Sequence, residues 1–251
     1  FKRAAEHVAK RNSTLHLMGL LSGSNSGHSQ PEHIQALLQF FRSHKVKNVV
    51  FHLFTDGRDT PKFSAAGLMS QFQKSLRPDE RISTIMGRLW AMDRKKDWSK
   101  TERAYHLLVS GEGIRVSSPE RAIREAYKRG ESDEFIAPTV ASGGPGNVLS
   151  ITDHDAVVFF NLRSDRARQL AKPFVQKDFN VLNPGSFRRK KVLRDFEFVA
   201  MTDFGPDLPD VLTAFPSRDI TQSLPVVLSG MSQLYIAESE KYAHITYFLK
   251  K

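Results

Sequence analysis

Short apolar runs alternate along this chain with segments whose apolar residues recur at helical spacing. No other feature of the sequence constrains its fold as strongly. Residues 15–21, LHLMGLL, form an apolar run of strand length. Residues 31–44 carry Ile34, Leu37 and Phe41 on one face of a helix. Repeated strand–helix alternation is typical of an α/β fold, because each helix returns the chain to the same sheet.

The two patterns recur to the end of the chain. We expect further strands at residues 48–54, 81–86, 156–160, 196–201 and 233–237, a last extended segment at 242–248, and further helices at 63–76, 99–109, 119–129 and 165–175. Ser99 and Glu102 have the spacing of a capping box. Near-continuous apolar strands fit a sheet that is covered on both faces. The prediction is therefore an α/β, three-layer domain with a mainly parallel central sheet.

Composition limits the classes of protein to be considered. No apolar run reaches the roughly 18 residues that span a bilayer, so no membrane partner is expected. The first residues lack the apolar stretch of a signal peptide, and the chain has no cysteine, which fits a cytoplasmic protein. A net charge of +10 favours anionic partners.

Polar residues gather after the predicted strands, at the sheet edge where open α/β folds bind ligands. Basic side chains follow four of the strand ends, and only one or two carboxylates accompany them. The basic residues are His28, Arg58, Arg88, Arg94, Arg163 and Arg166. Arginine binds carboxylate and phosphate through two parallel hydrogen bonds. Convergent arginines indicate a small ligand with several negative charges, such as a phosphorylated acid.

Local roles for the same residues remain open. Arg163 and Arg166 would also pair with Asp165, and Asp56 and Asp59 would also cap their turn and the next helix. The basic run at residues 188–191, RRKK, is read as a solvated loop. No aromatic residues interleave with it, so no nucleic-acid partner is expected.

Several motifs together resemble the cofactor-independent phosphoglycerate mutase family. They are LHLMGLLS with a histidine-containing loop, DGRDTP at residues 56–61, GR and AMDR within 87–94, DEFIAPTV at 133–140, FFNLRSDRARQL at 159–170, FVAMTDF at 198–204 and AESEKYAHITYF at 237–248. They occur in the family's order and cover nearly the whole chain.

The resemblance implies that residues 1–251 are a single, inserted substrate-binding domain. A phosphatase-like domain with the serine nucleophile and two manganese ions would lie outside this chain, which itself would hold no metal and no cofactor. The whole enzyme would interconvert 3-phosphoglycerate and 2-phosphoglycerate by phosphoryl transfer, and we expect it to be a monomer. This chain alone is expected to be inactive.

Matched motif by motif, the resemblance implies substrate contacts from His28, Arg58, Asp59, Arg88, Arg94, Arg163, Arg166 and Lys241. Asp59 would be the catalytic proton shuttle between the hydroxyls of glycerate, since a carboxylate among arginines stays ionised.

One loop departs from the family. Its first loop typically reads SDGGVHSH, whereas residues 22–30 here read SGSNSGHSQ, one residue longer and without the aspartate and the second histidine. A non-catalytic module that binds phosphorylated metabolites through a degenerate site is the alternative.

Overall fold

The computed structural model describes residues 1–142, 148–208, 211–216, 221–241 and 245. They divide into two units, residues 1–215 and residues 216–251, and each is described on its own.

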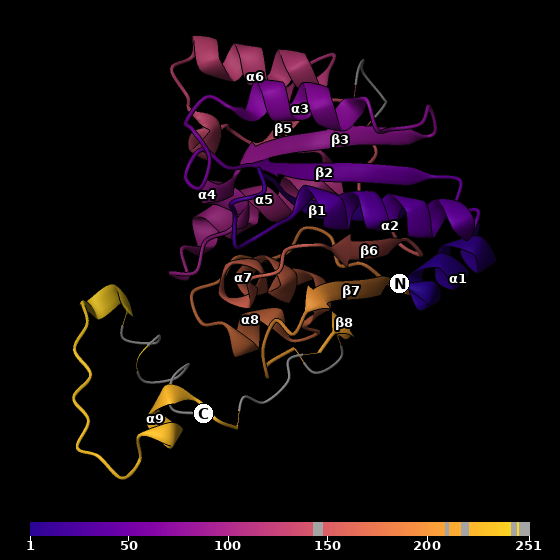
Figure 1. The fold of residues 1–251 in the computed structure, drawn as a ribbon. Helices are drawn as coiled ribbons and strands as arrows, with labels where there is room; N and C mark the ends of the chain where they lie inside the picture. Colours follow the sequence, from indigo (N-terminus) through magenta and orange to yellow (C-terminus); the bar gives the residue numbers. More distant parts are fainter. Residues whose placement is uncertain (143–147, 209–210, 217–220, 242–244, 246–251) are drawn as a thin grey trace. The chain divides into compact units, whose positions relative to one another are not determined.

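The first unit is built on a sheet with the strand order β4-β5-β3-β2-β1-β6-β7-β8 (Figure 1). The strands are β1 (Leu15–Leu21), β2 (Val49–Thr55), β3 (Glu80–Gly87), β4 (Ile114–Arg115), β5 (Thr139–Val140), β6 (Ala156–Phe159), β7 (Glu197–Thr202) and β8 (Leu212–Phe215). Neighbouring strands are parallel except β3 and β5, which run antiparallel. The mainly parallel sheet is therefore confirmed.

Helices cover both faces of the sheet. One face packs on α1 (Lys2–Arg11), α2 (Pro31–Ser43), α3 (Ala65–Gln73) and α6 (Pro119–Lys128). The other packs on α4 (Arg88–Ala91), α5 (Trp98–Ser110), α7 (Ser164–Val175) and α8 (Phe179–Leu182). Every residue of β1 is buried, with Leu17 in the first core and Met18 in the second, as a strand covered on both faces requires. The three-layer α/β prediction is confirmed.

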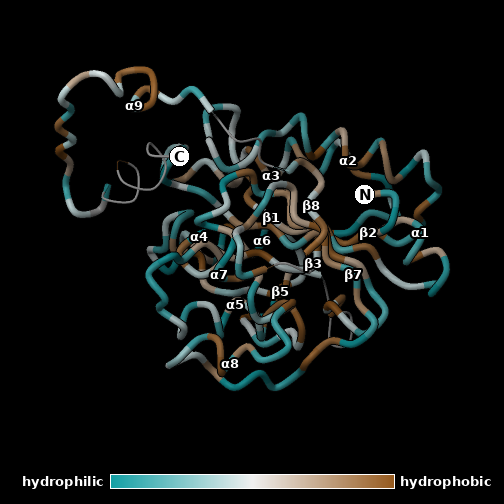
Figure 2. Tube along the Cα trace, turned by 90° about the horizontal axis from the view of Figure 1, so that it is seen from below, coloured by the Kyte–Doolittle hydropathy of each residue, from teal (hydrophilic) through white to brown (hydrophobic). Residues whose placement is uncertain are grey.

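Figure 2 shows how hydropathy varies along the backbone. Hydrophobic stretches run through several strands, whereas many connecting loops are hydrophilic. Among the described residues, no helix combines the length and the apolar character that crossing a membrane requires.

Two local predictions were wrong. Helix α5 begins at Trp98 with Asp97 as its N-cap, and the Ser99 hydroxyl donates to the Asp97 carboxylate at 2.6 Å, so Ser99 and Glu102 form no capping box. Residues 233–237 form no strand, because no described strand pairs with them and Leu234 is 84% exposed.

The second unit contains α9 (Leu224–Val227) and the 3-10 helix η2 (Ser239–Lys241). Its large apolar side chains that the structure describes are mostly exposed. The extended segment expected at residues 242–248 lies outside the described residues, apart from residue 245. The single 1–251 domain stays a prediction.

Candidate functional site

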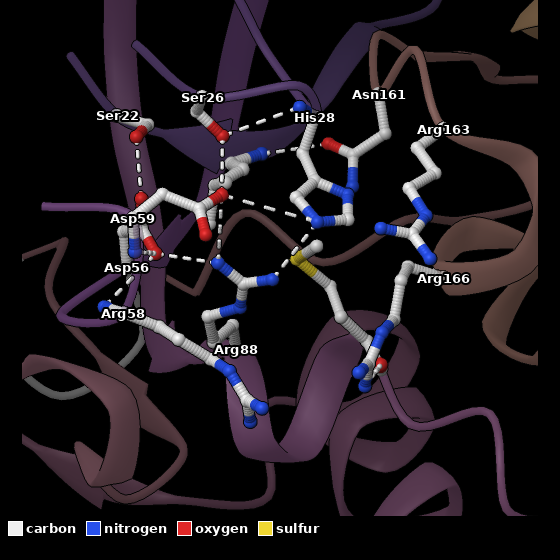
Figure 3. Close-up of polar contacts among 12 residues, drawn as sticks. Ser22, Ser26, His28, Asp56, Arg58, Asp59, Arg88, Asn161, Arg163 and Arg166 are labelled. Carbon is white, nitrogen blue, oxygen red and sulfur yellow. Dashed lines mark hydrogen bonds and ion pairs between the residues drawn. The ribbon is translucent and has the colours of Figure 1, made fainter. Parts of the chain in front are cut away.

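The loops after β1, β2, β3 and β6 meet at one end of the sheet (Figure 3). The chain leaves β1 towards β2 and β3 on one side and later returns to β6 on the other. This reversal beside β1 is the position where doubly wound sheets open a crevice for ligands. The side chains gathered here, called the arginine cluster below, are His28, Arg58, Asp59, Arg88, Arg94, Arg163 and Arg166.

Asp56 organises the turn after β2. Its carboxylate is 1% exposed and accepts the Ser22 hydroxyl at 2.5 Å and Arg88 Nη1 at 2.5 Å. The same carboxylate accepts the backbone N–H groups of Arg58 and Asp59 at 3.2 and 3.1 Å. The buried Asp56 carboxylate therefore has all its hydrogen bonds and fixes the backbone positions of Arg58 and Asp59 at the tip of the turn.

Two glycines let the 3-10 helix η1 (Asp133–Phe135) lie directly against this end of the sheet. Gly57 has φ +66°, the left-handed conformation that glycine adopts without strain. A Cβ on Gly87 would lie 2.2 Å from the Glu134 carbonyl oxygen. This close packing fixes the places where Arg58 and Arg88 leave the backbone.

Arg88 is the centre of the cluster. Its guanidinium is 5% exposed, lies 3.2 Å from Asp59 Oδ2, and donates to His28 Nε2 at 3.0 Å. Because arginine only donates, His28 must accept at Nε2 and carry its proton on Nδ1. Burial, reinforced by Arg88, lowers the pKa of His28 to about 4, so the imidazole is neutral at pH 7.

Asp59 faces the cluster with a side chain that is 29% exposed. Burial favours its neutral form, but the hydrogen bond from Ser26 and the charge of Arg88 outweigh burial and lower its pKa. Asp59 is therefore an ionised carboxylate that solvent and a ligand can still reach.

Arg94, Arg163 and Arg166 come from the segments that follow α4 and β6. Asp165 accepts Arg163 at 2.6 and 3.0 Å and Arg94 at 2.8 Å. Arg166 donates to the Met92 carbonyl at 3.3 Å, and burial together with Arg94 and Arg88 lowers its pKa. Arg58 is 58% exposed and lies 3.4 Å from Glu134.

More carboxylates contact these arginines than the sequence indicated. Asp56, Asp59, Glu134 and Asp165 each approach at least one of them. The expectation of only one or two carboxylates is therefore wrong. Arg163 does pair with Asp165, as the local alternative required, but its side chain remains 40% exposed and accessible to an anion.

Some buried polar atoms of the site have no partner among the described residues. They are His28 Nδ1, Ser29 Oγ, Asn161 Nδ2 and Arg166 Nε. Buried N–H groups without acceptors are uncommon, because each loses the free energy of a hydrogen bond. Three of these four atoms are nitrogen donors, which suits an anionic ligand.

The structure thus brings seven predicted residues together. Lys241 belongs to η2 in the second unit, and its substrate contact stays a prediction. Sequence analysis missed Ser26, which no pattern marked. It named Asp165 as a partner of Arg163 but did not anticipate that Arg94 would bind the same carboxylate.

The arginine cluster does not suit a metal ion. Arg88 occupies the space among Asp56, Asp59 and His28 that a cation would need. No group of three or more histidine, aspartate or glutamate side chains elsewhere in the described part of the chain is arranged to hold one either.

Known proteins share this fold and sequence. The family model of the BPG-independent phosphoglycerate mutase (PGAM) N-terminus matches residues 1–206. The 2,3-bisphosphoglycerate-independent phosphoglycerate mutase of Chloroflexus aurantiacus is 42% identical over 98% of this chain and 49% of its own length. That of Moorella thermoacetica is also 42% identical, over 98% and 47%.

A solved structure agrees. Leishmania mexicana phosphoglycerate mutase, crystallised at low cobalt concentration, superposes with a TM-score of 0.83 and 27% identity over 99% of this chain and 46% of that one. The chain spans about half the length of the relatives it matches. It belongs to the family of 2,3-bisphosphoglycerate-independent phosphoglycerate mutases, of which it contains the N-terminal region.

Proposed function

We propose that this chain is the substrate-binding part of a phosphoglycerate mutase that interconverts 3-phosphoglycerate and 2-phosphoglycerate. The observation that carries the proposal is the arginine cluster, in which guanidinium groups from three loops share one end of the sheet with an ionised Asp59 at the switch point. Its membership of the mutase family supports the same substrate.

The exposed arginines bind the two anionic ends of phosphoglycerate. Arg58 and Arg163 have accessible guanidinium groups, and a phosphate or carboxylate accepts two hydrogen bonds from each of them. Arg163 must first release Asp165 before it can bind the ligand, and breaking this ion pair reduces the net free energy of binding. We therefore expect modest affinity from this chain alone.

Asp59 moves the proton in this proposal. Its carboxylate is ionised at neutral pH and accepts a proton from a glycerate hydroxyl, then returns it to the other. His28 is neutral and keeps Nδ1–H available as a donor to the ligand. Arg88 stabilises the ionised form of Asp59 before it accepts the proton and after it returns it.

The phosphoryl-accepting serine and two manganese ions belong, in this proposal, to a phosphatase-like domain outside this chain. Such ions stabilise charge on the moving phosphoryl group. The substrate contact implied for Lys241 remains a prediction. The whole protein is proposed to act as a cytoplasmic monomer, with this small metabolite and the phosphatase-like domain as its partners.

Calorimetric titration of the 251-residue chain tests the proposal. 3-Phosphoglycerate carries both anionic groups, whereas glycerate and inorganic phosphate each carry one kind. We expect 3-phosphoglycerate to bind more tightly than either of these, because a second arginine fork is engaged. Equal affinity for phosphate and 3-phosphoglycerate would instead favour a general anion-binding module.

A further inference from the structure

The loop between β1 and α2 carries a serine that reaches Asp59. Ser26 Oγ donates to Asp59 Oδ2 at 2.8 Å, and the backbone N–H of His28 donates to Ser26 Oγ at 3.2 Å. Ser26 is 2% exposed, so water does not compete freely for this hydroxyl. In Figure 3, Ser26 and Arg88 approach the Asp59 carboxylate from opposite sides.

Gln30 holds the same loop closed. Its Nε2 donates to the carbonyl oxygens of Ser24 and Ser26, both at 3.1 Å. Gln30 is also the N-cap residue of α2, which begins at Pro31. The backbone of Ser26 is thus tied to the start of a regular helix, and its hydroxyl reaches Asp59 from a fixed position.

We infer that Ser26 is a positioning residue for Asp59, whose hydroxyl holds one carboxylate oxygen in place and stabilises its negative charge. The inference rests on the proposed function, because the proton-shuttle role of Asp59 is part of that proposal. It also gives the unusual SGSNSGHSQ loop a role, since Ser26 lies within the segment that departs from the family's pattern.

Titratable side chains also surround or approach Asp59, and their effects on its carboxylate must be distinguished from the effect of Ser26. Arg88 and His28 lie 3.2 and 3.9 Å from Oδ2. The remaining ones are Asp56 and Arg58 on its own turn, Glu134 beside Arg58, and Arg163, Asp165 and Arg166 from the loop after β6 and the start of α7. Among the influences that lower the pKa of Asp59, the hydrogen bond from Ser26 is the largest, followed by Arg88.

Carbon-13 NMR titration of the Asp59 carboxyl group in the 251-residue chain is the test. In Ser26→Ala the midpoint should rise by about half a pH unit to one pH unit, because the ionised form loses a hydrogen bond. Ser24→Ala, in the same loop, is the matched control, since the exposed Ser24 contributes its carbonyl oxygen rather than its hydroxyl. Its midpoint should equal that of the unmodified chain.

A second measurement needs no substitution. The Ser26 Cβ resonance of the unmodified chain should titrate with the same midpoint as Asp59, because the two side chains share one hydrogen bond. An unchanged Asp59 midpoint in Ser26→Ala, an equal shift in Ser24→Ala, or a Ser26 resonance that ignores the titration would each overturn the inference. These titrations contain no ligand, so their failure is distinct from a failure to bind 3-phosphoglycerate, which overturns the proposed function and with it the role of Asp59.

Discussion

At the residue scale, the chemistry of the site depends on which groups carry charge. Arg88 is shared by Asp56, Asp59 and His28, and its charge helps to lower the pKa of both Asp59 and His28. A buried ion pair of this kind contributes little net stability, since desolvation offsets the attraction between its charges. Its benefit is a fixed geometry, in which Asp59 and His28 are already positioned before a ligand arrives.

His28 should make the chain less stable in acid. Its pKa is about 4 in the folded chain against 6.5 for a free histidine, so between these values the unfolded chain binds a proton that the folded chain does not. The free energy of unfolding should therefore fall as pH drops from 6.5 towards 4. Urea unfolding across this range should show a weaker pH dependence for His28→Gln. NMR titration placing the His28 midpoint near 6.5 would contradict the argument.

Arg163→Ala should weaken 3-phosphoglycerate binding by about 1.5–3 kcal/mol, the contribution of hydrogen bonds to a charged group. The control is Arg188→Ala, which removes the same charge from an exposed position outside the arginine cluster. Calorimetric titration at fixed ionic strength should find that Arg188→Ala leaves the affinity almost unchanged. Equal losses in both variants would mean that net charge, and not a specific contact, attracts the ligand.

At the element scale, the parallel sheet explains why so much of the site was predictable. Four strands ending at one edge place their following residues together, so His28, Arg58, Arg88 and Arg163 were found from local patterns alone. Contacts between distant segments were not predictable. The packing of η1 against Gly57 and Gly87 and the reach of Ser26 to Asp59 depend on tertiary structure that no local spacing encodes.

The basic run at residues 188–191 shows the same limit. It was interpreted as a solvated loop, yet Arg189 donates to the carbonyls of Pro173, Gln176 and Lys177 near the end of α7. Lys191 likewise donates to the carbonyl oxygens of Val109 and Ile151. These side chains donate hydrogen bonds to carbonyl groups near helix ends and in a loop, which have no partner within a helix or sheet.

Gly87→Ala should destabilise the fold at the site. The added Cβ meets the Glu134 carbonyl oxygen at 2.2 Å, so η1 must move away from the end of β3. We expect the free energy of unfolding to fall by about 1–3 kcal/mol, the usual effect of overpacking. Gly67→Ala is the control, because its Cβ meets nothing within 4 Å inside α3 and alanine favours a helix by up to about 1 kcal/mol. Urea unfolding should give opposite signs for the two variants.

At the scale of the whole molecule, the two units differ in how far they bury their apolar side chains. The first has an apolar core on each face of its sheet. The second exposes Leu224, Val227, Leu234 and Ile236, each more than 60%, and forms only short helical turns among its described residues. Relatives about twice as long as this chain match it over both units. The arginine cluster of the first unit is thus compatible with a proposed reaction that requires further chain.

The 251-residue chain should therefore bind phosphoglycerate without converting it. Binding uses the arginine cluster and should weaken as salt rises, because the exposed Arg58 and Arg163 are screened by ions. Turnover in the proposed mechanism needs an activated serine and metal ions, and the described residues assemble no donor group for a metal. Calorimetric titration beside a coupled mutase assay, with and without manganese, separates these steps. Manganese-dependent turnover by the purified chain would show that the catalytic groups lie within residues 1–251, and the division of labour proposed between this chain and a phosphatase-like domain would then be wrong.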